Sequence, residues 1–106
     1  MNKKIEIQIK ELLANNKLTF VDRLASKMFF SHMSTLEDRL KSQEPLDNDE
    51  HDYRVVLNEI NEDVLSAAKE IAKITFSTYD QEPTMMEIVL IATHLQAQRY
   101  KEKEVK

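Results

Sequence analysis

No glycine occurs among the 106 residues of this chain, and proline occurs only twice, at Pro45 and Pro83. The other residues are rich in Leu, Ile, Lys, Glu, Met and Ala, most of which are good helix formers. Phosphate-cradling loops, dinucleotide-binding turns and tight hairpins all depend on glycine. The sequence therefore predicts one all-α domain over residues 1–106, a helical bundle, and argues against nucleotide-dependent catalysis.

Composition excludes several further classes of protein. Cysteine is absent, which excludes disulfides, thiolate metal sites and cysteine nucleophiles together. The formal net charge of −4 opposes contact with the phosphate backbone of a nucleic acid. No apolar run is long enough for a signal peptide or a membrane span. We therefore expect a cytoplasmic domain with no metal or cofactor and no direct contact with nucleic acid or membrane.

Apolar residues recur at helical spacing in five segments. The first predicted helix covers residues 3–15. The second covers about 19–42, beginning at a capping-box pattern of Thr19 and Asp22, and the third begins near Tyr53. Every fourth residue of the second helix belongs to its expected apolar stripe: Phe20, Leu24, Met28, His32, Leu36 and Leu40.

Two further capping patterns predict the last two helices. Asn61, followed by acidic residues, predicts the N-cap of a fourth helix that reaches Phe76. Thr84 and Glu87 form a second capping-box pattern, which predicts a fifth helix ending at about Glu102.

Two of the three histidines lie within these predicted helices. His32 belongs to the apolar stripe of the second helix, and His94 lies at the edge of the stripe of the fifth. Spacing alone favours the simpler interpretation that each ring packs in the core with a satisfied nitrogen. The third histidine, His51, lies in an acidic stretch that lacks the glycine and the closing glutamate of a calcium-binding loop, which indicates a solvated loop.

The segments around the two helical histidines are similar to signature motifs of the phosphotransferase-system regulation domain (PRD) family. Arg39 follows His32 by seven residues, and Glu87 precedes His94 by seven. The segment 67–72 resembles a third family motif, which lies between the other two, so the resemblance spans about residues 18–100. Three positions depart from the family pattern: Ser31 replaces an aspartate, Val89 a glycine and Leu90 a tyrosine.

The resemblance implies a bundle of five helices in antiparallel pairs, and a regulatory domain rather than an enzyme. It implies phosphoryl groups accepted on His94 and His32 from a phosphocarrier protein or a sugar-specific component of the phosphotransferase system. It also implies control of transcription or operon expression through an unknown output regulator, by a small stand-alone member that forms a homodimer. Because Ser31 carries no charge, we expect His94 to be the better acceptor.

Two supporting residues each have two interpretations. Arg39 either holds the phosphoryl group or forms a solvated pair with Glu37 or Asp38. Glu87 either belongs to the site or only caps its helix.

Three other functions remain open alternatives. A helical dimerisation or adaptor domain without phosphorylation is the first, and Ser31 favours it. A histidine phosphotransfer domain of two-component systems typically has a Lys-Gly pair after the histidine, where Thr35 and Leu36 stand here. An enzyme has little support, because no nucleophile, carboxylate partner or metal ligand stands at a telling spacing.

Overall fold

The computed structural model describes residues 2–44 and 57–98 of the chain. Within these ranges there are four α-helices and no strand: α1 (Lys3–Asn15), α2 (Arg23–Lys41), α4 (Glu62–Thr78) and α5 (Met85–Gln98). The all-helical prediction is confirmed for this part of the chain, but the count of five helices is not matched. The start of the predicted third helix, near Tyr53, and the predicted end of the fifth, near Glu102, lie outside the described residues.

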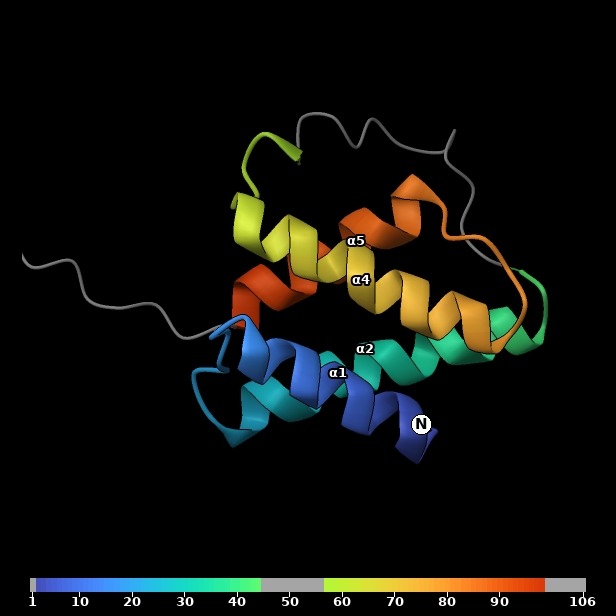
Figure 1. Cartoon of the computed structure of the whole chain (residues 1–106), viewed down its shortest axis with the longest axis horizontal. Helices are drawn as coiled ribbons and strands as arrows, with labels where there is room; N and C mark the ends of the chain where they lie inside the picture. The colour runs from blue at the N-terminus through green and yellow to red at the C-terminus, as the bar shows by residue number, and fades with distance from the viewer. Residues whose placement is uncertain (1, 45–56, 99–106) are drawn as a thin grey trace, which may run out of the picture.

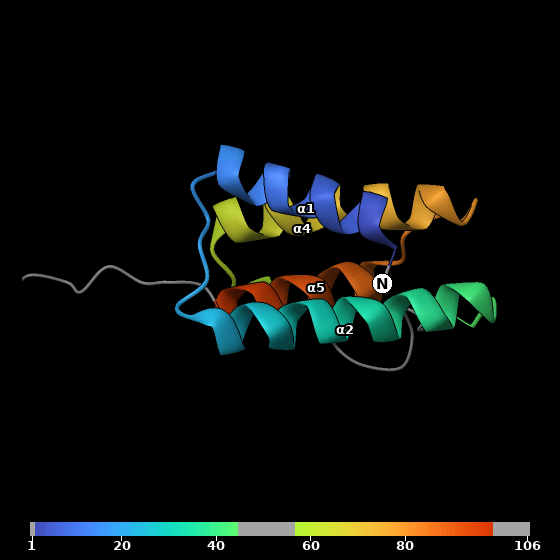
Figure 2. The same ribbon diagram turned by 90° about the horizontal axis from the view of Figure 1, so that it is seen from below.

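The helices form two layers (Figures 1 and 2). Helices α1 and α4 lie side by side in one layer, and α2 and α5 lie side by side in the other. The large apolar side chains between the layers are fully buried. They include Ile5, Ile9, Phe29, Met33, Leu36, Ile71, Phe76, Ile91 and Leu95. This packing holds α2 against α5, the two helices that carry His32 and His94.

Helix α2 begins later than the capping-box pattern predicts. Asp22, and not Thr19, is its N-cap, and the Asp22 carboxylate accepts a hydrogen bond from the Ala25 N–H at 2.8 Å. The predicted stripe is also displaced, since the Leu24 and Met28 side chains are 65% and 50% exposed. A helix turns once every 3.6 residues, so a strict four-residue spacing rotates around its surface. The buried apolar positions step by four, four, three and four residues instead: Ala25, Phe29, Met33, Leu36 and Leu40.

Three helices end in Schellman motifs built without glycine. Lys17, Gln43 and Asp80 follow the ends of α1, α2 and α4 with φ of 56°, 58° and 55°. Glycine usually occupies this left-handed position, and another residue costs roughly 1 kcal/mol there. After α2, the Glu44 N–H donates to the Arg39 carbonyl at 2.8 Å. The motif therefore fixes the turn of helix from which the Arg39 side chain extends.

A buried carboxylate on α2 joins three helices. Glu37 is 1% exposed and accepts hydrogen bonds from the Tyr79 hydroxyl at 2.7 Å and the Asn2 N–H at 3.2 Å. Burial, together with the Glu37 carboxylate, raises the pKa of Tyr79 to about 12. Glu37 thus links the start of α1 and the end of α4 to α2, and it is not the partner of Arg39.

Helix α4 begins after Asn61, as predicted, although the Asn61 side chain makes no capping hydrogen bond. Its N–H donates instead to Oε1 of Gln96 at 2.7 Å, and Nε2 of Gln96 donates to the Glu59 carbonyl at 2.8 Å. These two bonds tie the start of α4 to the last turn of α5.

Candidate functional site

His32 on α2 and His94 on α5 stack against each other. Their ring centroids lie 3.9 Å apart, and the ring planes make an angle of 20°. Both side chains are half-buried. The sequence placed each histidine on an apolar helix face but did not predict that one ring would cover the other.

A second pair of side chains joins the same two helices. The Arg39 guanidinium donates from Nε to Oε2 of Glu87 at 3.1 Å and from Nη2 to Oε1 at 2.7 Å. The Glu87 side chain is fully buried, and the Arg39 side chain is 23% exposed. A two-pronged contact of this kind is the strongest geometry for an arginine and a carboxylate.

This pair corrects both simpler interpretations. Arg39 does not form a solvated pair with Glu37 or Asp38, because its guanidinium reaches across to α5. Glu87 does more than cap its helix: its N–H donates to Oγ1 of Thr84 at 3.2 Å, as the capping pattern predicts, while its carboxylate binds Arg39.

The register of the two helices explains why both contacts form together. Arg39 follows His32 by seven residues, and Glu87 precedes His94 by seven. Seven residues are about two helical turns, roughly 10 Å along the axis, and return to the same helix face. Helices that run in opposite directions therefore match histidine with histidine and arginine with glutamate. The equal spacing in reverse order is the signal from which the contact could have been predicted.

The surroundings of the two rings favour their neutral form. Burial lowers the pKa of His32 from 6.5 to about 4, and the charges of His94 and Arg39 act in the same direction. Burial also lowers the pKa of His94. Near pH 7 both imidazoles therefore keep a nitrogen lone pair.

The two rings differ in how they are shielded. Nε2 of His32 is inaccessible to solvent and has no hydrogen-bond partner in the described part of the chain, a condition that no ring nitrogen of His94 shares. Ser31, the residue before His32, is exposed. Its carbonyl accepts a hydrogen bond from Oγ1 of Thr35 at 3.2 Å, within the same helix. His94 is thus the more open of the two histidines in geometry.

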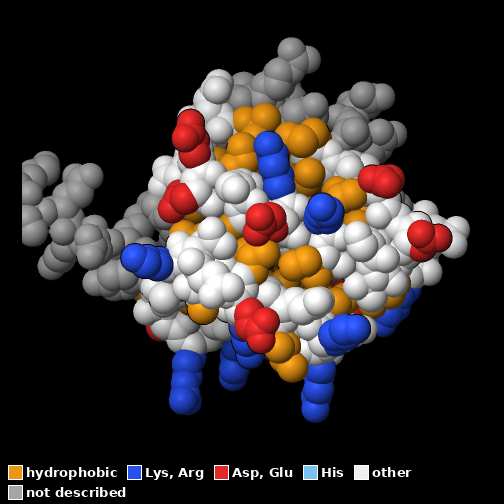
Figure 3. Space-filling view, in the orientation of Figure 1, with side chains coloured by type: hydrophobic (Ala, Val, Ile, Leu, Met, Phe, Trp, Pro, Cys, Tyr) orange, Lys and Arg blue, Asp and Glu red, His pale blue; other side chains and the backbone are white. Residues whose placement is uncertain are grey.

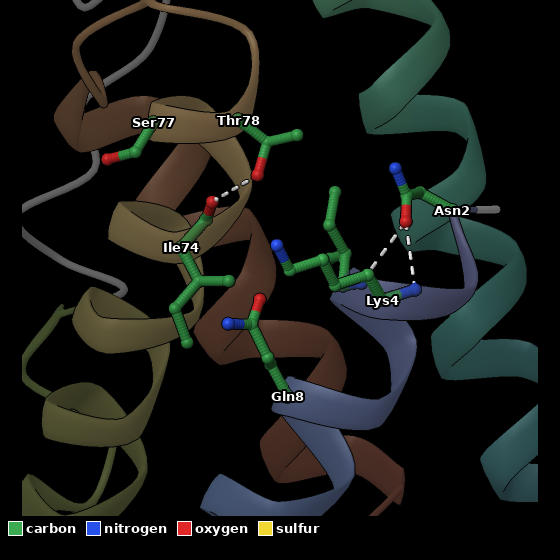
Figure 4. A pocket seen from close by; sticks show the side chains of 7 residues that line it. Asn2, Lys4, Gln8, Ile74, Ser77 and Thr78 are labelled. Carbon is green, nitrogen blue, oxygen red and sulfur yellow. Dashed lines mark hydrogen bonds between the residues drawn. The ribbon is translucent and has the colours of Figure 1, made fainter.

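The layer formed by α1 and α4, on the other side of the molecule from the histidines, has a surface of mixed character. Over α1 and α4, positive, negative and apolar side chains are interspersed, and no histidine is visible (Figure 3). An open cavity of about 400 Å³ lies between these two helices, lined mostly by polar side chains that include Asn2, Lys4, Gln8, Ser77 and Thr78 (Figure 4). None of the four residues of the histidine and Arg39–Glu87 pairs lines it. The cavity is therefore separate from the α2–α5 site.

The described residues form neither a metal site nor a membrane span. No group of three or more His, Asp or Glu side chains is arranged to hold a metal ion within residues 2–44 and 57–98. In the same ranges, no helix is both long and apolar enough to cross a bilayer.

Comparison with models of known protein families gives a match over most of the chain. The family model described as "PRD domain" matches residues 3–98, nearly the whole chain. No match was found among curated proteins or among solved structures.

Proposed function

Since the chain belongs to the PRD family of regulatory domains, we propose that it is regulated by transfer of phosphoryl groups from the sugar phosphotransferase system to His94 and His32. The observation that carries the proposal is the stacking of these two rings, with centroids 3.9 Å apart, between α2 and α5. A charge added there changes the contact between two packed helices.

The chemistry requires a neutral imidazole. The lone pair of a ring nitrogen on His94 or His32 forms the new N–P bond. At the same time the bond between phosphorus and the nitrogen of the phosphorylated donor protein, here called the donor nitrogen, breaks. The donor nitrogen keeps that electron pair and takes up a proton, and the acceptor ring releases the proton of its other nitrogen. The lowered pKa values of His32 and His94 support this role, because a protonated ring has no lone pair to offer.

Arg39 is the cation that would stabilise the added charge. A guanidinium has five N–H donors, of which two bind Glu87, so three are left for other acceptors. Its charge already lowers the pKa of His32, so its field reaches that ring. The buried Glu87 carboxylate holds the guanidinium in place before any phosphoryl group arrives, which makes Glu87 a positioning residue.

The regulated output belongs to the same proposal. A phosphoryl group at the α2–α5 contact would alter how this face packs, and a partner protein that controls transcription or operon expression would sense the change. Apolar side chains are available beside the site, since Val21, Leu24 and Met28 are exposed on or just before the first half of α2. Burial of this strip between two copies of the chain would give the homodimer that we propose.

The test is incubation with the general phosphocarrier proteins and phosphoenolpyruvate, followed by intact-protein mass measurement and acid treatment. We expect an acid-labile phosphoryl group whose initial rate of incorporation falls more in His94→Ala than in His32→Ala. His51→Ala is the matched control, and it should leave incorporation unchanged. If neither His32 nor His94 is modified, the phosphoryl-acceptor proposal fails.

A second candidate function is an adaptor domain that kept the fold without the chemistry. It is favoured by Ser31, an uncharged and exposed residue, and by the exposed apolar strip on α2. A chain that forms dimers in light scattering but takes up no phosphoryl group would support this candidate.

A further inference from the structure

We infer that the stacked His32 and His94 rings form one acceptor, which holds a single phosphoryl group at a time with the unmodified ring as its hydrogen-bond donor. The inference rests on the proposed function and adds the stoichiometry of the site. It begins from the near-parallel arrangement of the rings, 3.9 Å between centroids and 20° between planes.

Charge repulsion disfavours a second phosphoryl group. Each group brings about −1.5 to −2 elementary charges near pH 7. On two stacked rings the groups would lie at roughly 6 Å from each other, and Coulomb repulsion at that distance weakens the second transfer by about ten- to a hundredfold even with the dielectric constant of bulk water. The half-buried position of both rings increases the effect, because less solvent screens the charges.

The site also has too little positive charge for two groups. Near pH 7 the cation that acts on His32 is Arg39, because the lowered pKa of His94 leaves that ring neutral. Arg39 is already matched by the buried carboxylate of Glu87 at 2.7 and 3.1 Å. One phosphoryl group can share the outer N–H groups of this guanidinium. A second would find no further cation acting on His32 within the described residues.

Hydrogen bonding also favours a single phosphoryl group on the pair of rings. A neutral imidazole carries one N–H donor. While one ring is phosphorylated, the other can donate this N–H to a phosphoryl oxygen beside it. Modification of the second ring would replace this favourable contact with a contact between two anions.

The experiment counts phosphoryl groups per chain at low ionic strength. The full chain, His32→Gln, His94→Gln and the double variant are treated with excess phosphoramidate, a small phosphoryl donor for imidazole, and analysed by intact-protein mass spectrometry. His51→Gln is included in every sample so that the third histidine does not contribute. We expect one group on the parent chain, one on each single variant and none on the double variant.

Three results would overturn the inference. A parent chain that takes two groups, at a donor concentration that just saturates the single variants, excludes a shared acceptor. Uptake by only one single variant shows one reactive histidine and not a pair. No uptake by any chain, with phosphocarrier proteins as donor as well, removes the proposed function itself.

Peptide mapping of the parent chain tests the inference without a substitution at either ring. The map should show modification at both His32 and His94, while the intact mass shows at most about a tenth of the chains with two groups, as the ten- to hundredfold weakening of the second transfer requires. A larger doubly modified fraction in the intact mass contradicts the inference even if a single variant fails to fold.

Discussion

Replacement of Arg39 by methionine is expected to lower the free energy of unfolding by about 3–5 kcal/mol, the range observed when one partner of a buried ion pair is removed. The Glu87 side chain is fully buried, and Arg39 donates two hydrogen bonds to it, at 2.7 and 3.1 Å. Methionine keeps most of the apolar stem of arginine but deprives the buried carboxylate of this guanidinium. The loss therefore measures charge and hydrogen bonding more than packing.

The opposite substitution should cost less. In Glu87→Gln the Arg39 side chain, 23% exposed, can turn its charge toward water, so we expect a loss of about 1–2 kcal/mol. The double variant Arg39→Met/Glu87→Gln should be more stable than Arg39→Met alone, because it has no buried carboxylate at position 87. Lys41→Met, an exposed change on the same helix, serves as the control and should stay within about 0.5 kcal/mol.

Urea unfolding followed by circular dichroism supplies these values, provided that the free energy of unfolding falls with urea concentration at the same slope in all variants. A loss below about 1 kcal/mol for Arg39→Met would refute the reasoning. So would a double variant whose loss equals the sum of the two single losses, since contacting residues should show a coupling energy.

Two further predictions concern the histidine pair and the helix ends. In an NMR titration the His32 ring should protonate near pH 4 rather than 6.5; because its folded pKa is lowered, its contribution to stability is present above pH 6.5 and is lost as pH falls toward 4. A midpoint near 6.5 would contradict this burial. Lys17→Gly and Gln43→Gly should each stabilise the chain by about 1 kcal/mol in urea unfolding, because glycine adopts the left-handed conformation without strain. Lys69→Gly, inside α4, should destabilise it by a similar amount.

The sequence by itself determined the helical class, the family and most of the helix positions. Local propensity and periodicity are properties of neighbouring residues, so they place α1 at Lys3–Asn15 and the start of α4 after Asn61 correctly. They place the start of α2 less well, because Thr19 and Asp22 both suit an N-cap and only the packed structure selects Asp22.

Only the tertiary structure decided which side chains meet. The stacking of His32 on His94 and the contact of Arg39 with Glu87 depend on the packing of α2 against α5 in opposite directions. The first contact joins residues 62 positions apart and the second joins residues 48 positions apart. Hydrophobic burial fixes that packing for the whole chain at once. Spacing in the sequence could therefore place each histidine on a helix face, but only the packing of the two helices brings the two rings into contact.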